Sequence, residues 1–366
     1  MVGNVIELKP TYRFPFLLLG LMSLVAGLFT GIARLGIQVP GVYQSISGMH
    51  SALMISAFFG TIIGLERAVA TRYLWAYLAP LMSGLGGLVL VFIPEAIIVP
   101  ILFTLSSLVF TCASATILKK QRALFTYTLF IAGALWLAGN LFWLASGSLW
   151  SSIPFGLAFL IVTIAGERLE LTRFMKPNLI AARLFVLILL AIVGGGMMSS
   201  VTNFQNNMLY GSALCGLSIW LIRFDIARRT IFKEGITRFV AVCLLSGYFW
   251  LFAGGLLFAT GDLSSLAYQK DAGIHAVALG FIFSMVIGHS PIIFPAIMRV
   301  SIPFSTLLYI PLGLLQLGVA LRIMAVATQE GIFRVAGGVL NEAAILLFIA
   351  TLILQVLRGR RQQVLT

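Results

Sequence analysis

Three histidines are the residues of this chain best suited to chemistry, and all three lie in apolar segments. His275 and His289 lie in GIHAVALGFIFSMVIGH (273–289), and His50 lies in GMHSALMISAFFG (48–60). A histidine inside a membrane helix is costly to bury and indicates a functional site by default. The competing interpretation is an imidazole that is hydrogen-bonded to a neighbouring helix.

His50 and His275 form a matched pair. Each follows a glycine by two residues, and each lies a few residues inside the same predicted end of its helix. Two neutral imidazoles at equal depth on different helices are suited to axial ligation of a haem iron from both faces. A zinc or copper site needs further ligands nearby, and none is evident. We therefore take His50 and His275 as candidate haem ligands.

His289 lies 14 residues beyond His275. On a helix this is a rise of about 21 Å with a rotation of about 40°, so His289 faces a similar direction near the opposite end. A ligand of a second cofactor, a position on a proton path and a structural hydrogen bond remain open for it. Met285, one turn earlier, is either a soft metal ligand or a core residue.

A few charged residues lie at the predicted level of the paired histidines. Arg34, Arg322 and Arg334 are suited to binding the two propionates of a haem, because arginine holds carboxylates through paired hydrogen bonds. Ordinary interfacial anchoring is the alternative for each arginine. Glu342 is the clearest intramembrane carboxylate, and it either pairs with Arg322 or relays protons.

These residues require membrane helices to position them. Hydrophobic residues make up 60% of the 366-residue chain and charged residues only 10%, and the mean hydropathy is +1.06. A soluble domain does not carry so much apolar surface, and runs of about 20 apolar residues recur throughout. We predict an all-α integral membrane protein, a single domain over residues 1–366. The twelve expected spans are 14–33, 45–65, 74–93, 96–118, 123–146, 149–166, 179–199, 208–222, 239–260, 272–297, 304–325 and 335–357.

The net charge of +13 reflects how the helices are oriented in the membrane and does not indicate nucleic-acid binding. Twenty of the 24 basic residues fall on one side of these spans, and Arg34, Lys270, Arg322 and Arg334 fall on the other. By the positive-inside rule, both termini are predicted to be cytoplasmic. Membrane lipid is therefore the expected partner of the apolar helices.

Weak repeats suggest internal symmetry. TIIGLERAVATR (61–72) resembles VTIAGERLELTR (162–173), and GMHSALMISAFF (48–59) resembles GIHAVALGFIFS (273–284). Each falls on the second helix of a four-helix set, which predicts three units, 1–121, 122–236 and 237–366. Sites commonly lie between such repeats. The Glu66-Arg67 and Glu167-Arg168 pairs are expected to form ion pairs at cytoplasmic helix ends.

The segment HAVALGFIFSM, from His275, resembles the His-Ala-Leu-x-x-Gly…Met segment of the NnrS family. LLYIPLGLLQLGVALRIMAVA and NEAAILLFIATLILQ also resemble the closing helices of that family. The resemblance implies a twelve-span bacterial inner-membrane protein with haem b, linked to tolerance of nitric oxide. That family also contains copper, but its His-Glu-Met run has no counterpart in GMHSALM, which puts copper in doubt here.

The twelve-helix arrangement is more distantly similar to the catalytic subunit of haem–copper oxidases. In that subunit a low-spin haem is held by histidines on the second and tenth helices, which correspond to His50 and His275 here. Its oxygen-reducing centre needs additional histidines on the sixth, seventh and tenth helices, and spans 6 and 7 here have none. The resemblance therefore implies the haem site without the oxygen-reducing centre.

Three functions follow from these observations. The first is a haem-b protein that binds or responds to nitric oxide or another diatomic gas, or that accepts electrons from a donor, with one haem or two. The second is a cofactor-free secondary transporter with twelve helices, and the third is an accessory subunit of a respiratory complex. A homo-oligomer is compatible with each of them.

Overall fold

Helices make up all the regular structure in the described part of the chain. The computed structural model describes residues 8–172 and 178–365, and every regular element in these ranges is a helix. Arg173, which ends one of the repeats, lies outside them. The predicted all-α class is therefore confirmed for the described residues.

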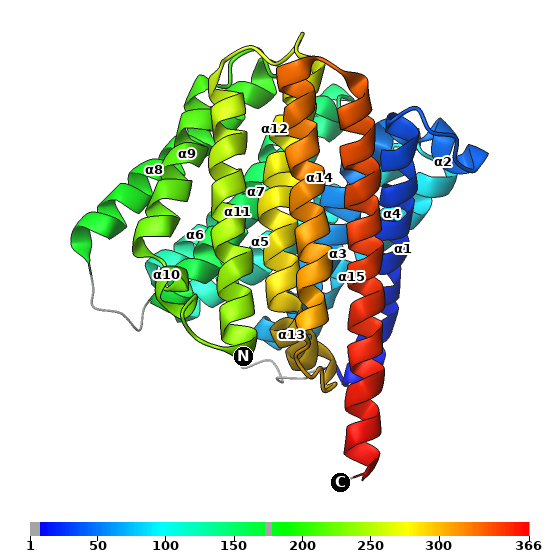
Figure 1. The fold of residues 1–366 in the computed structure, drawn as a ribbon, viewed down its shortest axis with the longest axis vertical. Coiled ribbons are helices and arrows are strands. Elements are labelled where there is room, and N and C mark those ends of the chain that lie inside the picture. The colour runs from blue at the N-terminus through cyan, green and yellow to red at the C-terminus, as the bar shows by residue number, and fades with distance from the viewer. Residues whose placement is uncertain (1–7, 173–177, 366) are drawn as a thin grey trace. The chain divides into compact units, whose positions relative to one another are not determined.

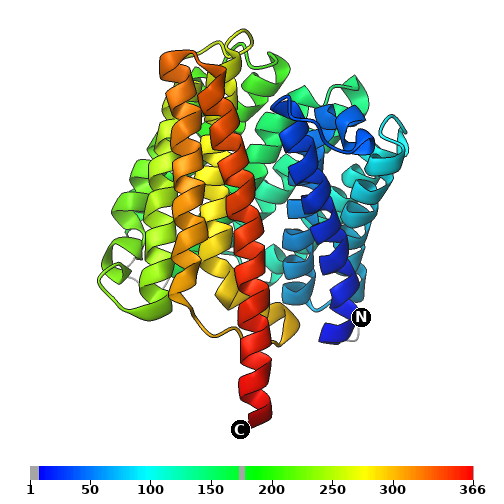
Figure 2. The ribbon, with the colours of Figure 1, turned by 45° about the vertical axis from the view of Figure 1, so that its right-hand side comes forward.

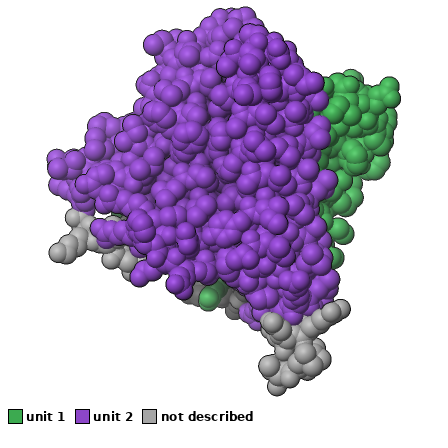
Figure 3. Space-filling model, viewed as in Figure 1, with its two compact units in different colours: residues 1–167 green, residues 168–366 purple. Residues whose placement is uncertain are grey.

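The chain forms two compact units, Met1–Glu167 and Arg168–Thr366 (Figure 3). The boundary between them lies inside helix α7. This differs from the three four-helix units suggested by the repeats, which stay a prediction. The elements of unit 1 are α1 (Pro10–Arg34), α2 (Gly41–Ser45), η1 (Ser47–Met49), η2 (Ala52–Phe59), α3 (Gly60–Thr71), η3 (Leu74–Tyr77), α4 (Leu78–Phe92), α5 (Ile98–Lys120), α6 (Leu124–Ser146), η4 (Trp150–Ser152) and most of α7 (Ile153–Thr172). Those of unit 2 are α8 (Leu179–Val201), α9 (Met208–Phe224), α10 (Ala227–Thr230), α11 (Gly235–Ala259), α12 (Ala267–His275), η5 (Ala276–Phe283), α13 (Ser284–Met298), η6 (Thr306–Leu308), α14 (Tyr309–Thr328) and α15 (Gly331–Leu365).

Eleven helical runs in the described residues are long and apolar enough to cross a membrane. The expected eighth span corresponds to α9, a shorter apolar helix of 17 residues. Large side chains such as Phe14, Leu187 and Leu346 are more than half exposed, as expected for helices that face lipid rather than water. The fold is that of a multi-pass membrane protein; the count of twelve and the side of both termini stay predictions.

Unit 1 packs around aromatic rings. The Trp136 and Phe159 rings stack with centroids 4.9 Å apart, and Phe110 packs edge-on against both. Such pairs stabilise a core beyond the area that they bury. They hold α5, α6 and α7 together beside η2, the segment that follows His50.

Unit 2 brings its helices together through glycines. A Cβ atom on Gly211 of α9 would overlap the backbone of α11, and a Cβ atom on Gly337 of α15 would lie 2.5 Å from the Gly318 carbonyl oxygen of α14. Figures 1 and 2 both show α14 and α15 as neighbouring antiparallel helices. Small residues allow this close approach, which drives helix association in membranes where hydrophobic burial does not.

Candidate functional site

His50 is held by helix α1 within unit 1. Its Nδ1 lies 2.8 Å from the carbonyl oxygen of Gly27 and 3.4 Å from the Thr30 hydroxyl. Thr30 Oγ1 itself donates to the same carbonyl at 2.8 Å. Because a carbonyl only accepts, Nδ1 carries a hydrogen, and in a neutral imidazole Nε2 then holds the lone pair.

His275 has the same tautomer within unit 2. Its Nδ1 donates to the Asp271 carbonyl oxygen, one turn earlier, at 2.7 Å. The Asp271 carboxylate oxygen Oδ1 also lies 3.4 Å from this nitrogen. A histidine that ligates a metal characteristically donates its other ring N–H to a carbonyl or a carboxylate. Both paired histidines therefore have the hydrogen bonding of an Nε2 ligand.

A wide-turn helix follows each of these histidines. The π-helical segments η2 and η5 are eight residues long and begin two residues after His50 and one residue after His275. Most π-helical segments are single turns, and they occur frequently at functional sites. The shared G-x-H repeat thus marks a shared local structure.

Two of the three predicted propionate anchors, Arg322 and Arg334, contact a carboxylate of the protein itself. Arg322 Nη1 lies 2.7 Å from Asp271 Oδ2, and Arg334 Nε lies 3.6 Å from Asp271 Oδ1. Arg322 Nε also donates to Asn341 Oδ1 at 3.1 Å. Sequence reasoning missed Asp271, although its position four residues before His275 places it on the same helical face. The propionate roles of the arginines stay predictions.

Glu342 and Arg34 occupy different surroundings. The Glu342 Oε2 atom is buried and has no hydrogen-bond partner among the described residues, while the two hydrogen bonds described for the Arg322 side chain go to Asn341 and Asp271.

In unit 1, the Arg34 guanidinium lies over the Trp150 ring, 5.3 Å from its centroid. This cation–π contact suits an interfacial anchor.

A second charged cluster surrounds His289 in unit 2. Arg168 forms a bidentate ion pair with Asp225, with Nη2–Oδ1 at 2.8 Å and Nε–Oδ2 at 3.1 Å. The Tyr248 hydroxyl donates to Oδ2 of the same carboxylate. His289 Nε2 lies 3.4 Å from Arg168 Nη1, and its Nδ1 lies 2.8 Å from the Met285 carbonyl oxygen.

This arrangement bears on the roles expected for the cluster. Both ring nitrogens of His289 have neighbours, so ligation by its Nε2 would require Arg168 to move, and the ligand role stays a prediction. The Met285 side chain is buried, and its methyl group lies against Gly247, which favours a packing role. Arg168, which was expected in an ion pair at the helix end, pairs with Asp225, 57 residues away; the expected Glu167–Arg168 pair stays a prediction.

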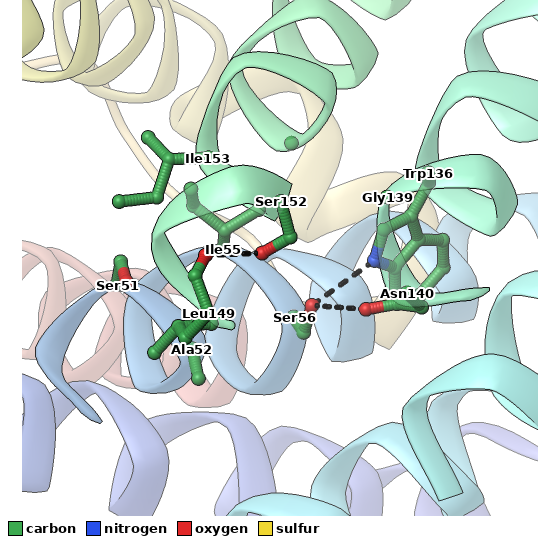
Figure 4. Close-up of a pocket in the computed structure, with 11 residues that line it drawn as sticks. Ser51, Ala52, Ile55, Ser56, Trp136, Gly139, Asn140, Leu149, Ser152 and Ile153 are labelled. Atoms are coloured by element: carbon green, nitrogen blue, oxygen red, sulfur yellow. Dashed lines mark hydrogen bonds between the residues drawn. The ribbon is translucent and has the colours of Figure 1, made fainter. Parts of the chain in front are cut away.

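A small polar cavity adjoins η2 in unit 1 (Figure 4). Ser51, Ser56, Asn140 and Ser152 line it together with Trp136 and apolar residues. Its volume is ≈ 10 Å³, which is about the room that one water molecule needs. The Trp136 indole donates to Ser56 Oγ, and Ser56 donates to Asn140 Oδ1, each at 3.2 Å.

The fold and these interior polar groups define an α-helical multi-pass membrane protein with charged and histidine sites inside its helical units. The chain belongs to the family described as domain of unknown function DUF8744, whose model matches residues 13–357. No curated protein matches it.

Proposed function

We propose that this chain is a haem-b-binding protein of the bacterial inner membrane, with His50 and His275 as the axial ligands. One observation carries the proposal: each histidine lies just before a π-helical segment and donates its Nδ1–H to a backbone carbonyl. Nε2 would then be the ligand atom of both histidines. The two histidines belong to different units. The proposal therefore requires that both of them bind the same iron.

The surrounding residues fit a haem. Gly27 and Asp271 fix the two imidazoles through their carbonyl oxygens. Arg322 and Arg334 both lie beside the carboxylate of Asp271, and guanidinium groups placed in this way suit carboxylates such as a haem propionate. A bound haem would supply reversible one-electron chemistry at its iron.

Ligation by two histidines favours electron transfer, because both axial positions of the iron are then filled. Binding of nitric oxide would require one histidine to leave. The hydrogen bond that holds His50 goes to Gly27 on another helix, α1, whereas the one that holds His275 goes to Asp271 on its own helix. We therefore propose electron transfer as the basal activity and a nitric oxide response as the ligand-dependent one.

Haem quantification tests this proposal. Protein purified in detergent from haem-sufficient cells should give a b-type pyridine haemochrome with about one haem per chain. Nitric oxide added to the reduced protein should change the absorption bands only if a histidine dissociates. Stoichiometric absence of haem from correctly folded protein would contradict the proposal.

Secondary transport is the second candidate, and one observation favours it. Unit 2 contains two separate ion pairs, Arg168–Asp225 and Arg322–Asp271. Charged groups in the membrane interior mark ion and proton pathways. Under this candidate, folded haem-free protein in liposomes should move protons when a pH gradient is imposed, and haem-dependent redox activity should be absent.

A further inference from the structure

Asp271 contacts His275 in two ways. Its backbone oxygen accepts the Nδ1–H hydrogen bond at 2.7 Å, and its carboxylate oxygen Oδ1 lies 3.4 Å from the same nitrogen. The two residues are one turn apart on continuous helix, so their side chains lie on the same face. Nδ1 of His275 therefore faces a negative charge.

The carboxylate is fixed by groups from two other helices. Arg322 of α14 binds Oδ2 at 2.7 Å and Arg334 of α15 approaches Oδ1 at 3.6 Å. Arg322 is fixed in turn by Asn341, whose Nδ2 donates to the Leu315 carbonyl oxygen at 3.0 Å. The Asp271 side chain is 18% exposed and that of Arg322 is 7% exposed. A long chain of hydrogen bonds thus limits the rotation of the aspartate.

We propose that Asp271 is the positioning residue of His275. Its backbone oxygen fixes the tautomer with hydrogen on Nδ1. Its carboxylate, held beside the same nitrogen, orients the ring and adds negative charge that makes the imidazole a stronger donor to a metal. This inference rests on the proposed haem function. Outer partners of this kind characteristically change metal affinity by about 10–100-fold when they are removed.

The test compares Asp271→Asn with wild type and with Asp262→Asn. Asp262 is an exposed carboxylate in the loop before α12 that bonds to the Ser264 backbone N–H, so its variant controls for loss of one acidic residue near this end of unit 2. Asp271→Asn should lower haem affinity about 10–100-fold. The haem that remains should have a more positive reduction potential, because removal of a negative charge destabilises ferric iron. Asp262→Asn should leave both quantities unchanged.

A measurement on haem-free protein separates the positioning role of Asp271 from the proposed haem binding. The chain has three histidines, so ¹⁵N-histidine labelling gives few signals, which the His50→Gln and His289→Gln variants assign. In haem-free wild type, His275 should show protonated Nδ1 and unprotonated Nε2. Asp271→Asn should keep this tautomer, because the backbone acceptor remains, and should shift the Nδ1 signal, because the carboxylate beside it loses its charge.

The outcomes are distinct. Wild type that binds no haem overturns the proposed function, whatever the NMR result. Wild type that binds haem, with unchanged potential, affinity and His275 signals in Asp271→Asn, overturns the positioning role. If Asp271→Asn does not fold because Arg322 loses its carboxylate, the double variant Asp271→Asn/Arg322→Gln, measured against Arg322→Gln, decides by the same readouts.

Discussion

Replacing Asp225 by leucine removes the carboxylate that pairs with Arg168, and we expect this to destabilise unit 2 by about 3–5 kcal/mol. The structure supports the upper part of this range. Arg168 is 3% exposed and Asp225 2%, so water does not replace the lost partner. The carboxylate accepts two hydrogen bonds from Arg168, one from Tyr248 and one from the Ile226 backbone N–H. The ratio of folded to unfolded protein should fall by about two to three and a half powers of ten.

A double-mutant cycle provides the assay and its control. Asp225→Leu, Arg168→Met and the double variant are unfolded in mixed micelles with increasing denaturing detergent, and helicity is followed by circular dichroism. A buried ion pair replaced by apolar residues is often tolerated, so the double variant should lose much less stability than the sum of the two single losses. Additive losses, or single losses below about 1 kcal/mol, would show that the two residues do not act as a buried pair.

Further predictions concern packing, the buried polar network and topology. Gly337→Ala should push α15 away from the Gly318 backbone and destabilise unit 2, whereas Gly313→Ala, with no atom near its new methyl group, should be neutral or slightly stabilising in the same unfolding assay. Asn140→Leu removes the partner of Ser56 and of the Phe103 carbonyl oxygen and should cost about 1–3 kcal/mol; thermal unfolding within error of wild type would argue against the network. The positive-inside rule predicts a cytoplasmic C-terminus, so a C-terminal phosphatase fusion should be inactive and a fluorescent-protein fusion bright.

The helices were predictable from sequence because the membrane imposes a length and an apolar composition on every span. The paired histidines were also visible as candidates, since G-x-H recurs at His50 and His275. The hydrogen bonds that fix their tautomers were not. Gly27 lies 23 residues before His50, and this pairing depends on how α1 packs against the following helices.

The charged clusters show where sequence reasoning stops. Asp225 looks like an ordinary loop carboxylate, and its partner Arg168 is 57 residues away. Asp271 offered a local signal, one turn before His275, that sequence reasoning overlooked. The π-helical form of η2 and η5 has no equivalent signal in composition, because apolar residues fit α- and π-helical turns alike. Only the repeat connected the two segments.

The most direct test of the central claim is the reduced-minus-oxidised optical spectrum of the purified protein, recorded for wild type, His50→Ala, His275→Ala and His289→Ala. The proposal predicts a sharp low-spin b-type spectrum in wild type that is lost in His50→Ala and in His275→Ala. His289→Ala should keep it, since His289 contacts Arg168 and the Met285 carbonyl. A featureless wild-type spectrum, or a low-spin spectrum that survives in either of the first two variants, would contradict axial ligation by His50 and His275.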